Sequence, residues 1–410
     1  MEVEIIKVAF RNIVRNERRS KLTIITIVIG VTILMNMQGL LRGLTSTVYG
    51  RMMAMDTGQV QVEAEGYRAD ARRLPLDRVV GDSGTLAAEL AALPGVKAVS
   101  ERIDASFEIT NGRDGVRVMA RGIGPSETQV TELGGKIVEG RLFAPGEPGL
   151  VIGKGLADKL GLRVGDSAYF TAMDRHSVRN LGSAPVVGVF NYDYPLFDDR
   201  MVFLDIDQAR AFLDLGEVAT RIVVRGDRPG ASAALTREVA GALPSGLVAF
   251  EWKVFAENLV STIETRLKLL FTILSVLFCL IIAGIFNTMA MSVQERYREI
   301  GTLRAIGIRK RGLERIFLAE GLIMGLAGCL VAAIPSTAIG LWLGVWGIDL
   351  SGIFPRDIPI PFGTALHAAY SVADALRALA AGLGAAVMGA LVPARAAARL
   401  PITEALTATK

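Results

Sequence analysis

The sequence predicts a membrane protein with four transmembrane helices and a large α+β domain inserted between the first and second of them. Hydrophobic residues make up 51% of the 410 residues, and the mean hydropathy of +0.41 is high for a soluble protein. Four apolar segments are long enough to cross about 30 Å of hydrocarbon, which takes roughly 20 residues in a helix. They cover residues 22–41, 269–291, 316–345 and 376–392.

The first two segments of the chain predict two helices. Residues 1–21 place apolar side chains on one helical face and basic side chains on the adjoining face, which predicts an amphipathic helix on the cytoplasmic surface of the membrane lipids. Residues 22–44 predict the first transmembrane helix with an outward extension. A signal peptide is disfavoured, because the apolar segment exceeds the usual h-region of about 7–15 residues and no small-residue cleavage pattern follows it.

Residues 45–262 predict an α+β domain of two subdomains. Strand-like alternation occurs at 59–63, 116–120, 184–190, 201–204 and 221–224, and helical patterns occur at 84–92, 154–160, 207–213 and 231–242. Two stretches, 90–96 and 239–247, each end a helix with Leu-Pro and then enter a strand. This weak repeat predicts that residues 45–129 and 217–262 form one subdomain, with residues 130–216 inserted as the second.

The distribution of Lys and Arg predicts the orientation. Six precede the first apolar segment, seven lie between the second and third, and only Arg356 lies between the third and fourth. By the positive-inside rule, both termini are cytoplasmic and residues 45–262 lie outside. The other predicted segments are transmembrane helices at 263–291, 316–345 and 375–393, a cytoplasmic connector at 292–315, a short periplasmic loop at 346–374 and a cytoplasmic tail at 394–410.

Small residues in the third span predict close packing between helices. Gly321 with Gly325, and Gly340 with Gly344, form Gly-x-x-x-Gly patterns that let helix backbones approach one another in lipid. Glu320 lies in the same span, where an unpaired charge is costly. We therefore expect it to face protein and to pair with a base from residues 296–311, such as Arg304; the alternative is a position at the level of the lipid headgroups.

No pattern in the sequence predicts catalysis, a metal site or a cofactor site. The two histidines, His176 and His367, lack metal-ligand spacing to another ligand, and there is no G-x-x-x-x-G-K-[ST] phosphate loop. Cys279 and Cys329 both lie in spans, where they are expected to be packing residues. The net charge of +4 reflects the clusters flanking the membrane, so no nucleic-acid partner is predicted.

The connector has the pattern of a polar helix at the point where an apolar span leaves the bilayer. Its charged positions include Glu295, Arg296, Glu299 and Arg304, and its apolar side is Ile300, Leu303 and Ile306. One interpretation is an ordinary surface helix anchored by its apolar side. The other is a rigid connector, ended by a turn at Gly307, that transmits force from a bound partner.

The connector also resembles a known family. Residues 292–307 match the S-V-x-E-R-x-R-E-I-G-x-L-R-A-x-G signature of FtsX-like permeases, the membrane subunits of the MacB and lipoprotein-releasing class of ABC transporters. Residues 11–20 resemble the family's amphipathic entry helix, and residues 151–157 and 162–166 resemble its periplasmic core domain. The similarity continues through 393–406, although Pro401 sits one place early and Thr407 replaces a base of the family pattern.

The resemblance implies a machine that transmits mechanical force. Two permeases, identical or different, would pair, and each would dock one ATPase of a cytoplasmic ABC ATPase dimer through a coupling helix at 293–304. ATP and Mg would be bound by the ATPase, with no cofactor on this chain. The residues that this implies for ATPase coupling are Glu295, Arg296, Arg298, Glu299, Gly301, Leu303, Arg304 and Gly307. Gly321, Gly325 and Glu320 would serve helix packing.

Within this family, the size of the external domain favours the lipoprotein-releasing and MacB-like branches. Only 21 residues precede the first span, so the ATPase is expected on a separate chain. We favour lipoprotein release from the inner membrane to a periplasmic carrier. The polar loop at 173–183 could bind that carrier through Asp174, Arg175, His176 and Arg179, or it could be an ordinary exposed hairpin. The alternatives are MacB-like efflux of peptides or drugs through an outer-membrane duct, and regulation of a cell-wall hydrolase.

Overall fold

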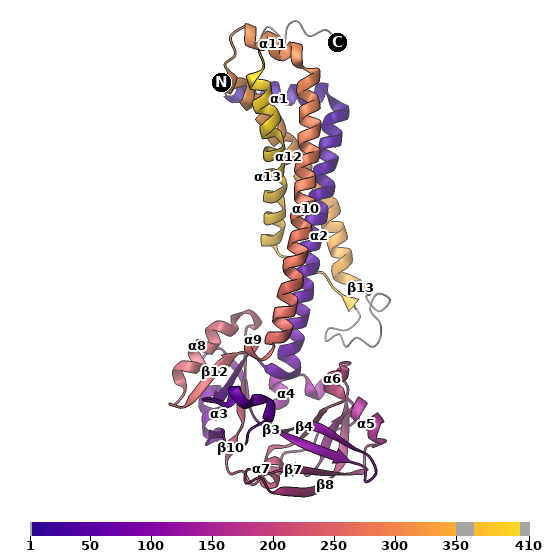
Figure 1. The fold of residues 1–410 in the computed structure, drawn as a ribbon, viewed down its shortest axis with the longest axis vertical. Coiled ribbons are helices and arrows are strands. Elements are labelled where there is room, and N and C mark those ends of the chain that lie inside the picture. The colour runs from indigo at the N-terminus through magenta and orange to yellow at the C-terminus, as the bar shows by residue number, and fades with distance from the viewer. Residues whose placement is uncertain (1, 350–364, 402–410) are drawn as a thin grey trace. The chain divides into compact units, whose positions relative to one another are not determined.

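A computed structural model describes residues 2–349 and 365–401 of the chain (Figure 1). The described residues divide into two compact units. The helical unit comprises residues 2–46, 262–349 and 365–401, and the sheet unit comprises residues 47–261. Most of the predicted loop at 346–374 and the tail positions around Thr407 lie outside the described residues.

The helical unit contains the four predicted spans. Each of four helices, α2, α10, α12 and α13, is long and apolar enough to cross a membrane, which confirms the prediction. The helices extend beyond the apolar segments, because a helix continues through polar residues once it has formed. The elements that contribute to this unit are α1 (Glu2–Arg15), α2 (Glu17–Met52), α10 (Glu257–Glu295), α11 (Tyr297–Ala305), α12 (Lys310–Val345), β13 (Ile348–Asp349), β14 (Ala365–Leu366) and α13 (Val372–Arg399).

Small residues bring α12 and α13 together, as predicted for one of the two glycine pairs. A Cβ atom added at Gly321 would lie 2.6 Å from the Cβ of Ala390, and one at Gly325 would lie 2.7 Å from the Cβ of Ala386. The other pair differs from the prediction. Gly340 faces the ring of Tyr370, in the segment that precedes α13, so this pattern marks contact with a connecting segment and not with a helix.

The sheet unit is α+β, as predicted. Its strands are β1 (Val60–Ala64), β2 (Val80–Gly81), β3 (Val96–Thr110), β4 (Gly115–Ile123), β5 (Ile137–Gly140), β6 (Leu150–Gly153), β7 (Ser167–Met173), β8 (Arg179–Phe190), β9 (Met201–Asp205), β10 (Val218–Ala219), β11 (Arg221–Gly226) and β12 (Leu247–Glu251). Its helices are α3 (Ser83–Ala91), α4 (Glu127–Val130), α5 (Lys154–Leu160), α6 (Pro195–Asp198), α7 (Ile206–Phe212), α8 (Ser232–Ala242) and α9 (Trp252–Phe255). Both Leu-Pro stretches end a helix and enter a strand, α3 into β3 and α8 into β12, as predicted.

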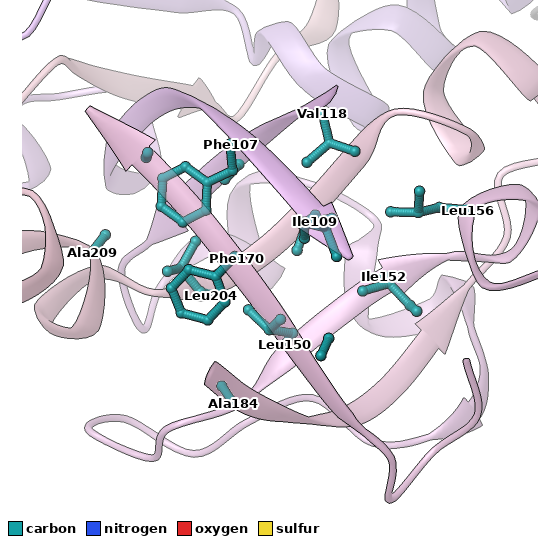
Figure 2. Close-up of a cluster of buried hydrophobic side chains, with 14 of the residues drawn as sticks. Phe107, Ile109, Val118, Leu150, Ile152, Leu156, Phe170, Ala184, Leu204 and Ala209 are labelled. Carbon is teal, nitrogen blue, oxygen red and sulfur yellow. The ribbon is translucent and has the colours of Figure 1, made fainter. Parts of the chain in front are cut away.

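Part of the sheet closes on itself. The pairings run from β3 to β4, β9, β6, β8 and β7, and β7 pairs again with β3. The side chains inside this circuit form a continuous apolar core, of which Figure 2 shows the central part. In that core the rings of Phe107 and Phe170 stack with their centroids 5.5 Å apart. Aromatic and β-branched side chains on alternating positions explain why these strands bury one face.

The sheet topology corrects the predicted division into two subdomains. A single path of strands runs from β12 through β1, β11, β3 and β4 to β5. Strand β3 belongs to both parts, since Val99 packs in the cluster with β1 and β11 while Phe107 packs inside the closed circuit. The boundary at residue 129 was misplaced because a 15-residue strand serves two cores, which local patterns do not reveal.

Candidate functional site

The connector between α10 and α12 is bent and not a single helix. Helix α10 ends at Glu295, Arg296 leaves helical geometry with φ −99° and ψ 17°, and α11 follows. The single coupling helix predicted at 293–304 is therefore wrong in its geometry. At the far end Gly307 has φ +98°, a conformation that favours glycine, and its N–H donates to the carbonyl of Arg304.

The apolar side of α11 packs against α12. Ile300 is buried together with Leu313 and Phe317 of α12, and Leu303 packs against the same cluster. Gly301 is buried as well. Ile306 departs from the prediction, because its side chain is 72% exposed beyond the end of the helix. The connector is therefore fixed to the third span by one face.

A buried polar network fixes the bend. Arg296 is only 7% exposed, and its Nη1 donates to both carboxylate oxygens of Glu320 on α12, at 2.9 and 3.2 Å. Asn12 of α1 donates to the same carboxylate at 2.7 Å. The prediction that Glu320 pairs with a base of the connector is confirmed, but the base is Arg296 and not Arg304. We call Asn12, Arg15, Arg296, Glu299 and Glu320 the connector network.

Ion pairs tie the N-terminal helices to the same point. Arg296 Nε donates to Glu299 at 3.1 Å, and Glu299 also pairs with Arg15 of α1. Glu295 pairs with Arg19 of α2. Helices α1 and α11 accordingly lie at the same end of the helical unit (Figure 1). The N-terminal bases were predicted only as part of an amphipathic helix on the membrane surface, and these ion-pair partners were missed, although both segments were predicted on one side of the membrane.

The structure thus separates the predicted coupling residues into two groups. Arg296 and Glu299 point into the connector network, and Gly301 and Leu303 pack inward. Arg298 is exposed and forms no ion pair with any residue in 2–349 or 365–401, and Arg304 is half-buried. Exposed bases at Arg309, Lys310 and Arg311 follow. The outward surface of the connector is basic, so it suits an acidic partner surface.

The predicted carrier loop is the hairpin turn between β7 and β8. The carboxylate of Asp174 accepts the backbone N–H groups of Val178 and His176, at 2.9 and 2.8 Å, and these bonds lower the pKa of Asp174. Asp174 therefore shapes the turn, where Ser177 has φ +62°. His176 Nε2 lies 3.2 Å from Asp214.

The other two loop residues, Arg175 and Arg179, line a cavity of about 520 Å³. Arg73 and Arg117 line the same cavity, together with Asp77, Glu108 and Met173. None of these four arginines forms an ion pair with another described residue. Sequence reasoning missed Arg73 and Arg117 because they come from segments far from the hairpin.

Two family models match the chain, and together they cover most of it. The MacB-like periplasmic core domain matches residues 20–242, and the FtsX-like permease C-terminal model matches residues 271–402. The chain belongs to the FtsX-like permeases with a MacB-like periplasmic core domain. This permease is of the ABC transporter class, and the model matches place the connector in the C-terminal region and the β7–β8 hairpin in the periplasmic core domain.

Relatives of the permease come from both branches of this class. The lipoprotein-releasing system transmembrane protein LolC of Neisseria meningitidis serogroup B is 24% identical over 96% of this chain and 95% of its own length. The macrolide export ATP-binding/permease protein MacB of a Shewanella species is 23% identical over 98% of this chain and 60% of its own length. The solved periplasmic region of MacB from Actinobacillus actinomycetemcomitans, at 14% identity, covers 50% of this chain and 94% of its own with a TM-score of 0.36.

The described part of the permease offers no metal centre. Within residues 2–349 and 365–401, no group of three His, Cys, Asp or Glu side chains is arranged to hold a metal ion. Cys279 and Cys329 are both unpaired thiols.

Proposed function

We propose that this permease is the membrane subunit of an ATP-driven machine that releases lipoproteins from the inner membrane to a periplasmic carrier. The observation that carries the proposal is the connector: a bent segment fixed internally by buried ion pairs, with a basic outer surface. A displacement of such a segment by a bound partner would be transmitted to the transmembrane helices. Both termini would be cytoplasmic and the sheet unit periplasmic.

The ATPase is proposed to be a separate cytoplasmic protein that binds ATP and Mg. The sequence contains no phosphate loop. The alignment with LolC covers 95% of that protein, whereas the alignment with MacB, which is named as both an ATP-binding and a permease protein, covers 60%. Two permeases, identical or different, would pair and dock an ATPase dimer. Arg298 and Arg304 are the connector residues that we assign to this contact.

The connector network gives the proposed coupling its stiffness. Arg296 and Glu320 are both nearly excluded from solvent, so each charge depends on the other for stabilisation. Rotation of α11 away from α12 would separate them and leave two buried charges unpaired. A displacement of α11 by the ATPase would therefore move α12 and α1 with it instead of bending the connector.

The β7–β8 hairpin is proposed to bind the carrier, with the arginine-lined cavity beside it. Four guanidinium groups that form no ion pair within residues 2–349 and 365–401 surround one cavity, and they favour an acidic partner surface, because complementary charge accelerates encounter and fixes register. Met173, Val178 and Leu181 are exposed on the same hairpin and offer apolar contact.

Efflux through an outer-membrane duct is the second candidate, supported by the similarity to MacB over 98% of this chain. Co-purification in mild detergent separates the candidates. An acylated protein and a periplasmic carrier in the complex support lipoprotein release, whereas an exit-duct protein contradicts it in favour of efflux. A cell-wall hydrolase in their place contradicts both.

The same experiment tests the hairpin. Arg175→Glu with Arg179→Glu should remove the carrier from the complex and leave the ATPase bound. Arg113→Glu, at an exposed position on the β3–β4 turn, is the matched charge-reversal control. Carrier recovery at the wild-type level in the double variant would reject the hairpin as the binding site.

A further inference from the structure

Helix α2 is extended in the sheet unit by a short π-helix, and the backbone of this π-helix is hydrogen-bonded to other residues of that unit. The helix continues from Met52 into a π-helix, η1 (Met53–Thr57). The last carbonyl groups of a helix have no partner within it, and they form the negative end of its dipole. Here the carbonyl of Ala54 accepts the N–H of Glu132 at 2.8 Å, and that of Thr57 accepts Nε2 of Gln61 at 2.8 Å.

The carbonyl group of Asp56, which lies between Ala54 and Thr57 in the chain, accepts a hydrogen bond from a buried arginine. Arg102 Nη1 donates to the carbonyl oxygen of Asp56 at 2.5 Å and lies 3.7 Å from its carboxylate. Arg121 Nη1 donates to the same carboxylate. Arg102 and Arg121 are 0% and 1% exposed, and they lie on the neighbouring strands β3 and β4. One residue of the helix end is thus held through both its backbone and its side chain.

Each of the two arginines is also hydrogen-bonded to a second carboxylate of the sheet unit. Arg102 donates to both oxygens of Glu127, at 2.5 and 3.1 Å, and Arg121 Nε donates to Asp104 at 2.6 Å. We call Asp56, Arg102, Asp104, Arg121 and Glu127 the buried joint. All five belong to the sheet unit.

The chemistry of the joint indicates a purpose other than stability. Replacing buried ion pairs by apolar side chains of similar volume is often neutral or stabilising, so an apolar contact would hold the helix end equally well. Apolar contacts, however, are non-directional, whereas guanidinium–carboxylate bonds fix both distance and angle. A helix end held by directional bonds from two adjacent strands resists rotation and sliding against them.

We propose that the buried joint is the element through which movement of α2 enters the sheet unit, with Asp56 as its principal positioning residue. The inference rests on the proposed function, since it requires that α2 carries movement. Residues 17–46 of this helix belong to the helical unit and residues 47–52 to the sheet unit. A push on the cytoplasmic side would therefore reach β3 and β4 through Asp56, Arg102 and Arg121.

The test measures the joint directly in the full-length permease. Cysteines at Arg51, in the last turn of α2, and at Arg117, on β4, both exposed, would carry spin labels in a background with Cys279→Ala and Cys329→Ala. We expect Asp56→Asn to broaden the distance distribution between the labels. Glu147→Gln, which removes the exposed Arg141–Glu147 pair of the same unit, should leave it unchanged.

A second variant separates loss of the joint from loss of folding. Asp56→Leu replaces the charged contact by an apolar one and leaves Arg121 paired with Asp104 and Arg102 paired with Glu127, so the protein should fold and still give the broadened distribution. In the reconstituted transporter, both variants should hydrolyse ATP at the wild-type rate while release falls about tenfold. An unchanged distance distribution, or wild-type release, would overturn the proposal. A wild-type transporter that releases no cargo would instead refute the proposed function. The distance measurement would then still show whether Asp56 fixes the end of α2 relative to β4.

Discussion

The contacts of Arg296 distinguish between the two interpretations of the connector, a solvated surface helix and a segment fixed to the third span. The family signature places it among residues that could face a partner, yet its guanidinium is buried between Glu320 and Glu299 and lies 5.3 Å from the ring of Phe317. At the scale of single residues, a charge pattern on a predicted helix thus describes two surfaces. One is exposed and is the surface that we propose to face the ATPase, and the other packs against the rest of the chain.

Removing Arg296 should destabilise the helical unit. Arg296→Ala leaves Glu320 buried without its base, and a buried pair broken in this way costs about 3–5 kcal/mol. The variant should lower the thermal unfolding midpoint in detergent markedly. Arg395→Ala is the matched control, because the Arg395–Glu314 pair is largely exposed and such pairs contribute about 0–1 kcal/mol. Equal midpoints for the two variants would contradict the assigned role of Arg296.

Two buried carboxylates of the sheet unit should respond to pH in opposite directions. Burial alone would raise the pKa of Asp104, but Arg121 and Arg221 outweigh burial and lower it to about 2. Its stabilising effect is therefore complete above its ordinary pKa of 3.8 and is lost as the pH falls toward 2. For Glu63 burial prevails and raises the pKa above 4.5, so the ionised form destabilises the fold as the pH rises.

The directions of these two pKa shifts predict how substitution of Asp104 and of Glu63 changes stability. At pH 7.5, about three to four units above the ordinary carboxyl pKa values, Asp104→Asn should cost at least about 2 kcal/mol, whereas Glu63→Gln should be neutral or stabilising. Near pH 4 the difference between Glu63→Gln and wild type should vanish. Unfolding midpoints across this pH range measure both effects. A destabilising Glu63→Gln at neutral pH would contradict the direction given for Glu63.

At the scale of elements, helix spacing depends on residues without side chains. Gly321→Leu would place atoms where the Cβ of Ala390 now lies and force α12 away from α13. Overpacking of this kind typically costs about 1–3 kcal/mol. Gly384→Ala on α13, where an added Cβ would meet nothing within 4 Å, should leave the unfolding midpoint unchanged or raise it slightly. A midpoint for Gly321→Leu equal to that of Gly384→Ala would refute this account of the interface.

The elements also show what local sequence patterns could and could not predict. The four spans, the α+β class and many of the helices and strands were predicted, because apolar length and periodicity are local properties. The pairing of Glu320 with a base of the connector was predicted, but the base was named wrongly, and the bases of α1 and α2 on the connector and the arginines at 73 and 117 were missed. Each depends on contacts between segments that are far apart in the sequence, and no spacing rule within one segment reports such contacts.

At the scale of the whole molecule, the connector and the periplasmic domain must lie on opposite sides of the membrane if the proposed function is right. In a background with Cys279→Ala and Cys329→Ala, a cysteine at Thr110 should react with a membrane-impermeant maleimide in intact cells. A cysteine at Arg311 should react only after the inner membrane is opened. Reaction of both in intact cells would contradict the orientation.

The central claim is that this permease converts the work of a separate ATPase into movement of its periplasmic domain. The most direct measurement uses the purified chain in liposomes, first alone and then with its ATPase, while ATP hydrolysis and cargo release are both recorded. We predict that the chain alone hydrolyses no ATP and releases no cargo, and that the ATPase restores both. Hydrolysis or release by the chain alone would contradict the account.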